Sequence, residues 1–169
     1  MKRLYVVMGV SGCGKSTLGQ LLAQRLTAPF LDADDYHSEA AKALMRKGIG
    51  LNDVMRAPWF DRLEQAIKSQ PESSIVLACS ALSKNHRQRI RAMASEVRFL
   101  LLEVAPDLLS SRLENRQQHF ANTSLLKSQL STFEYPENEN DVLPFDGAGE
   151  SAILIEHVID TLERHNVCC

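Results

Sequence analysis

The sequence of 169 residues contains no apolar run near the roughly 20 residues that a membrane-spanning helix needs, so we expect no membrane partner. Positive charge is not in excess, because the sequence has 19 lysines and arginines but 21 aspartates and glutamates, which gives a net charge of -2. This balance, without a basic stripe interleaved with aromatics, predicts no nucleic-acid partner. The four cysteines lack the spacing of a metal site or a disulfide framework, which favours a cytoplasmic protein.

What the chain does contain is a globular composition, 44% hydrophobic, in a length that fits a single domain over residues 1–169. Short apolar runs alternate with helical patterns along it. We expect strands in residues 3–9, 29–35, 74–80, 97–104 and 141–146. We expect helices in residues 15–26, 82–94, 106–116 and 151–165. This alternation predicts an α/β fold, a five-stranded parallel sheet with helices on both faces. Pro144 suits only an edge of such a sheet or the end of a strand.

A glycine-rich segment lies between the first expected strand and the first expected helix. Its residues Gly9-x4-Gly14-Lys15-Ser16 have the spacing of a phosphate-binding loop, in the strand-loop-helix context that such a loop requires. Lys15 would reach the β- and γ-phosphates of a nucleotide, Ser16 would offer its hydroxyl to Mg²⁺, and Thr17 would bond the α-phosphate. The predicted cofactor site comprises Gly9, Val10, Ser11, Gly12, Cys13, Gly14, Lys15, Ser16 and Thr17.

Acidic residues follow the second expected strand. In an extended segment Asp32 and Asp34 would project to the same side. Two carboxylates near a bound Mg²⁺ can divide the work, with Asp32 supporting the metal and Asp34 orienting or deprotonating an acceptor hydroxyl. The alternative is that these acids cap the next helix, a role that suits Asp35 best.

Several longer motifs occur in one order: MGVSGCGKST, DADDYH, GIGLNDVMRAPW, ACSAL, and HF after an arginine-bearing helix. Together they resemble the gluconokinases, small ATP-dependent kinases of gluconate, over residues 4–145. The resemblance implies phosphorylation of D-gluconate at the 6-hydroxyl with ATP and Mg²⁺, a three-layer P-loop nucleoside-kinase-like fold and a homodimer. Two stretches exceed an ordinary crossover: residues 36–68 would be an acceptor-binding insertion, and residues 116–135 a mobile lid.

The resemblance also implies roles for single residues. Lys15, Asp34 and Arg116 would be catalytic. The acceptor would contact Asp34, His37, Asp53, Arg56, Ser80 and His119. Arg112 and Arg116, at the base of the lid, would contact the nucleotide. Because gluconate has a carboxylate, the fork-shaped guanidinium of Arg56 suits it.

Structural roles remain open for these residues. Arg56 could form a salt bridge with Asp53 or Asp61, and Ser80 could cap the following helix. Trp59 belongs either to the core beneath the acceptor region or to the wall of the sugar site.

Further cations lie outside these motifs. Arg112 could form a surface pair with a neighbour such as Glu114. Helical spacing places three cations on one face, which solvation explains about as well as substrate attraction: Lys84, Arg87 and Arg91. Departures from the resembled pattern are Val54, Met55 and Gln118, which bear on acceptor identity. Alternative functions are phosphorylation of another small acceptor, a shikimate-like acid or a nucleoside monophosphate, and nucleotide-binding regulation without catalysis.

Overall fold

The computed structural model describes residues 1–114 and 123–167, in which strands and helices alternate as the sequence pattern predicts. The strands are β1 (Arg3–Met8), β2 (Phe30–Asp32), β3 (Ser74–Ala78), β4 (Glu96–Glu103) and β5 (Val142–Asp146). The α-helices are α1 (Lys15–Leu26), α2 (Glu39–Arg46), α3 (Asp53–Ser69), α4 (Lys84–Arg91), α5 (Pro106–Glu114), α6 (Thr123–Thr132) and α7 (Ser151–Val167). A short 3₁₀ helix, η1 (Ala33–Tyr36), directly follows β2.

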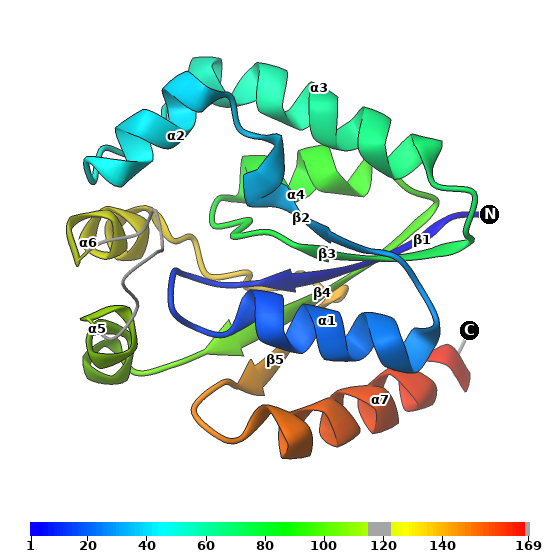
Figure 1. Ribbon diagram of the computed structural model, residues 1–169. Coiled ribbons are helices and arrows are strands. Elements are labelled where there is room, and N and C mark those ends of the chain that lie inside the picture. Colours follow the sequence, from blue (N-terminus) through cyan, green and yellow to red (C-terminus); the bar gives the residue numbers. More distant parts are fainter. Residues whose placement is uncertain (115–122, 168–169) are drawn as a thin grey trace.

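The strands form one parallel sheet in the order β2-β3-β1-β4-β5. Its central strand is β1, where Tyr5 lies opposite Val76 of β3 and Arg98 of β4. Figure 1 shows α3 and α4 over one face of the sheet and α1 and α7 over the other. The carboxyl ends of the strands point toward α2, α5 and α6. The predicted three-layer α/β fold is therefore confirmed.

Two apolar cores lie on the two faces of the sheet. Alternate residues of β1 separate between them: Leu4, Val6 and Met8 pack with α3 and α4, and Tyr5 and Val7 pack with α1 and α7. All five side chains are nearly or completely inaccessible. A strand buried on both faces is apolar throughout instead of alternating, which is why the β1 sequence is a continuous apolar run. The cores fix β1 firmly, and with it the loop that follows Met8.

Polar residues begin three of the helices. The side chain of Ser38 accepts a hydrogen bond from a backbone N–H of α2, Asn52 does so for α3, and Ser83 for α4. Each cap satisfies an N–H that the helix itself leaves unpaired. None of the helices in the described ranges is long and apolar enough to cross a membrane.

The strand β5 lies at an edge of the sheet, as Pro144 predicts. Within the part of the chain that the structure describes, it pairs only with β4, where Pro144 lies opposite Leu101. The opposite edge is β2, which has only three residues.

Candidate active site

The loop between β1 and α1 has a backbone that only glycine permits at key positions. Gly9 has a φ of 142°, and a Cβ on it would lie 2.8 Å from the Sγ of Cys13 and 2.9 Å from the carbonyl oxygen of Leu102. Gly14 has a φ of 102° and precedes the first residue of α1 without a side-chain cap. The first N–H groups of α1 therefore remain open to an anion.

Lys15 and Ser16, at the end of this loop, each donate a side-chain hydrogen bond within the protein. The Nζ of Lys15 donates a hydrogen bond to the carbonyl oxygen of Val10 at 3.1 Å, so the ammonium is folded over the loop. The hydroxyl of Ser16 donates to Oδ2 of Asp32 at 2.8 Å. The structure thus brings together the two residues predicted to hold the metal.

A hydroxyl and a carboxylate at this place fit Mg²⁺, a hard cation that prefers oxygen ligands. Within residues 1–114 and 123–167 there is no cluster of three or more histidine, cysteine or acidic side chains that could hold a metal alone.

The acids after β2 are not extended, contrary to the prediction. The chain turns into η1 at Ala33, and Oδ1 of Asp32 accepts a hydrogen bond from the backbone N–H of Asp34 at 3.1 Å. Asp32 therefore caps η1, so the capping alternative holds for Asp32, although Asp35 suited it best in the sequence. Asp32 and Asp34 nevertheless both line the small cavity at the phosphate loop. The turn into η1, and not the alternation of an extended strand, brings the two residues together.

A second, larger cavity of about 670 Å³ adjoins the small one of about 70 Å³. Its walls come from η1, the start of α3, the loop between β3 and α4, and α6. The larger volume lies within the range of pockets for small molecules. Five residues line both cavities: Asp34, Met45, Ser80, Leu125 and Gln129. A group held in the larger cavity would therefore meet the phosphate site beside Asp34.

One wall of the larger cavity is the side chain of His37. Its ring stacks on Trp59 with centroids 4.6 Å apart, and only 6% of the side chain is exposed. Burial, together with the charges of Arg56, Arg62 and Lys42, lowers the pKa of His37 to about 4. A neutral imidazole results at neutral pH, and among the described residues its buried Nδ1 has no hydrogen-bond partner. Such a nitrogen suits a ligand hydroxyl.

Trp59 belongs to the core, which confirms one of the two interpretations made from the sequence. It is 6% exposed and packs in the core beneath η1, where its Nε1 donates to the carbonyl oxygen of Ala33 at 2.6 Å. The same residue lines the larger cavity.

Opposite charges meet at the start of α3. Oδ1 of Asp53 lies 3.5 Å from Nη1 of Arg56 and 3.2 Å from Nε2 of His86. The contact with His86 lowers the pKa of Asp53, and burial lowers the pKa of Arg56 and that of His86. The salt bridge expected between Arg56 and Asp53 therefore exists, and both residues also line the larger cavity. His86 lines it too and was not predicted.

The remaining predicted residues divide clearly. Ser80 lines both cavities, and the cap of α4 is Ser83, so the capping interpretation of Ser80 was wrong. Arg112 donates to the carbonyl oxygens of Gly12 at 3.3 Å and Gly147 at 3.0 Å, so it lies against the phosphate loop, and its contact with the nucleotide stays a prediction. Arg116 and His119, with Gln118, lie outside the described residues.

Gln129 is the clearest residue that the sequence analysis missed. It lies on α6, and its Oε1 accepts a hydrogen bond from the backbone N–H of Ser11 at 2.7 Å. The glutamine amide thus contacts a backbone donor of the phosphate loop. No local pattern could identify it, because the contact spans 118 positions of sequence.

Comparisons with known proteins agree with this arrangement. A family model described as shikimate kinase matches residues 11–162. A "Probable gluconokinase" of Dictyostelium discoideum is 41% identical, covering 80% of this chain and 72% of that protein. The "Thermosensitive gluconokinase" of Escherichia coli is 36% identical, covering 97% of this chain and 91% of that protein. The crystal structure of a gluconokinase from Sinorhizobium meliloti has a TM-score of 0.84 at 34% identity, covering 95% of this chain and 91% of the other. This chain, with its phosphate loop and the larger cavity beside it, belongs to the gluconokinase family.

Proposed function

We propose that this protein transfers the γ-phosphoryl group of ATP to the 6-hydroxyl of D-gluconate, giving ADP and 6-phospho-D-gluconate. The observation that supports this most strongly is the junction of the two cavities at Asp34. Phosphoryl transfer requires donor and acceptor sites that meet in line, and little covalent chemistry from the protein.

On the donor side, the phosphate loop amides, Lys15 and Thr17 hold the phosphates, and Arg112 braces the loop from the side of α5. Mg²⁺ held by Ser16 and Asp32 would supply charge neutralisation of the phosphates. Lys15, folded over the loop, can turn toward the β- and γ-phosphates. Arg116, if it approaches from the lid, would add a second positive charge.

On the acceptor side, Asp34 orients the 6-hydroxyl of gluconate and accepts its proton. The bond between the 6-oxygen and phosphorus forms while the bond from phosphorus to the departing ADP oxygen breaks, and the proton later passes to solvent. Arg56 binds the gluconate carboxylate through its fork of N–H donors, and Asp53 fixes the orientation of that fork. His37, being neutral, and Ser80 bond hydroxyl groups along the chain of the sugar acid.

The finer assignments remain part of this proposal: residues 36–68 as the acceptor-binding insertion, residues 116–135 with His119 as the lid, a cytoplasmic location and a homodimer. A closed lid would exclude water and so suppress hydrolysis of ATP.

The decisive experiment is a coupled ADP-release assay with ATP and Mg²⁺, with and without D-gluconate. Shikimate and nucleoside monophosphates serve as the comparison panel, and the Lys15→Ala variant as the control for contaminating kinases. We expect release that depends on gluconate and disappears in the variant. Release with another acceptor alone would refute the substrate, and ATP binding without release on any acceptor would favour the non-catalytic regulator.

A further inference from the structure

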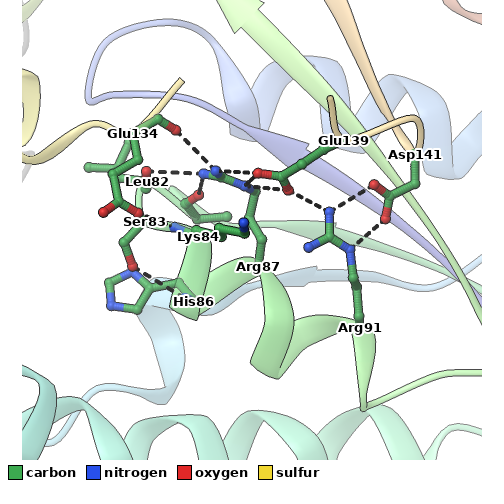
Figure 2. A network of polar contacts seen from close by, with 10 residues as sticks. Leu82, Ser83, Lys84, His86, Arg87, Arg91, Glu134, Glu139 and Asp141 are labelled. Atoms are coloured by element: carbon green, nitrogen blue, oxygen red, sulfur yellow. Dashed lines mark hydrogen bonds and ion pairs between the residues drawn. The ribbon is translucent and has the colours of Figure 1, made fainter. Parts of the chain in front are cut away.

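Arg87, in the middle of α4, is completely buried. The expectation of a solvated helix face or a ligand contact was therefore wrong for this residue. Burial of a guanidinium is costly unless every donor is satisfied and the charge is paired. Figure 2 shows how the surroundings of Arg87 meet both conditions.

Each of the five N–H groups of the guanidinium has an acceptor. Nε and Nη2 donate to the carboxylate of Glu139 at 2.9 and 2.7 Å. Nη1 donates to the carbonyl oxygens of Ala81 and Leu82, both at 3.0 Å, and Nη2 also donates to that of Glu134 at 3.0 Å. The bonds from Arg87 hold the pKa of Glu139 at about 2, so the pair stays ionised.

The three carbonyl groups share a location. Ala81, Leu82 and Glu134 all line the larger cavity, whereas neither Arg87 nor Glu139 does. Arg87 therefore stands behind the wall of the acceptor site and contacts the backbone of that wall, without reaching the ligand space itself.

The part of the cavity wall formed by Ala81 and Leu82 needs such support. Ala81 has a φ of 48°, in the left-handed region that residues with a Cβ avoid. The carbonyl oxygen of Leu82 also accepts from the backbone N–H of Glu134 at 3.0 Å, and the Glu134 carboxylate accepts from the backbone N–H of Lys84 at 2.5 Å. The loop after β3 is thereby tied to the chain that leaves α6.

We propose that Arg87 is a positioning residue for the acceptor: its planar fork holds the backbone of residues 81, 82 and 134 in the shape that binds gluconate. The inference rests on the proposed function, because it assigns the larger cavity to the acceptor. Arg87 would then affect how the acceptor site binds its ligand. It would not affect the nucleotide site, because among the described residues it has no contact there.

The chain offers a matched control one turn further along α4. Arg91 bonds the same Glu139 carboxylate at 2.6 Å and also Asp141 at 2.6 Å, but it touches none of the three wall carbonyls (Figure 2). Arg91→Lys and Arg87→Lys therefore disturb one ionic network, and only Arg87→Lys withdraws the donors that hold the cavity wall.

The test compares steady-state kinetics and acceptor binding in the two variants. Binding is followed through Trp59, the only tryptophan of the chain and a residue of the cavity wall. We expect Arg87→Lys to raise the KM and the dissociation constant for gluconate at least tenfold, with the KM for ATP within twofold of the wild type. Arg91→Lys should leave all three within twofold. Should Arg87→Lys fail to fold, Glu139→Asp keeps the charge but withdraws the carboxylate, and should raise the gluconate KM at least threefold.

The proposal would be overturned if the KM and the dissociation constant for gluconate were the same in the wild type and in Arg87→Lys. It would also be overturned if both arginine variants changed these two constants equally, or if the KM for ATP rose in parallel with them. In the Glu139→Asp experiment, an unchanged gluconate KM would have the same meaning. A wild-type protein that lacks gluconate-dependent turnover would instead refute the proposed function, so the two failures are distinguishable.

Discussion

The buried imidazole of His37 makes protein stability depend on pH in a way that the structure quantifies. Its pKa is lowered from 6.5 to about 4, with burial as the main cause. Between these values the unfolded chain binds a proton that the folded protein does not, so stability falls as pH falls. The contribution of neutral His37 to the free energy of unfolding is fully present above pH 6.5 and is lost by about pH 4.

The size of this effect follows from the shift. Each pKa unit corresponds to about 1.4 kcal/mol, so the whole window is worth about 3 kcal/mol, and the part between about pH 7.5 and about pH 5 is worth about 2 kcal/mol. Of the charges around the ring, Arg56, Arg62 and Lys42 oppose protonation, and Asp34, 3.9 Å from Nε2, favours it.

The assay is urea unfolding of the ligand-free wild type and His37→Phe at these two pH values. Phenylalanine keeps a ring against Trp59 but cannot titrate. We expect the wild type to lose about 2 kcal/mol more than the variant on acidification. Equal losses in the wild type and His37→Phe would refute the claim that His37 is neutral in the site.

Three further predictions concern the site and its support. Lys15→Ala should lower turnover in the ADP-release assay at least about a hundredfold, and near-normal turnover would contradict the role of the phosphate loop. Asp34→Asn should lower turnover by roughly 10² to 10⁴ with ATP affinity little changed, measured by titration calorimetry; a fall in ATP affinity alone would instead assign Asp34 to the metal. Trp59→Phe should lower the free energy of unfolding by about 1–3 kcal/mol in circular dichroism, because the carbonyl oxygen of Ala33 loses its donor. Unchanged stability would show that this hydrogen bond is not needed.

The sequence predicts the fold well because the relevant information is local. The continuous apolar run of β1 and the glycines before Lys15 determine a strand and a loop from neighbouring residues, and Pro144 indicates an edge strand by its missing N–H. The resemblance to gluconokinases then identified His37, Asp53 and Arg56, which the structure gathers around one cavity.

What the sequence did not predict depends on contacts between distant segments. Arg87 looks like a surface residue of a polar helix until Glu139, 52 positions away, pairs with it. Gln129 similarly acquires its contact with Ser11 only when α6 packs over the phosphate loop. The extended interpretation failed at Ala33 for a different reason, since the side chain of Asp32 caps η1, the alternative that the sequence analysis had left open.

The two margins of the sheet bear on how copies of this protein can associate. An exposed strand is a template on which a second chain can add by backbone pairing, and proteins discourage this with prolines and very short outer strands. Here β5 contains Pro144 and β2 has three residues, so neither margin invites extension into a neighbour. A homodimer of this protein would therefore have to be built from helix and loop surfaces, and strand addition is disfavoured as a route to aggregation.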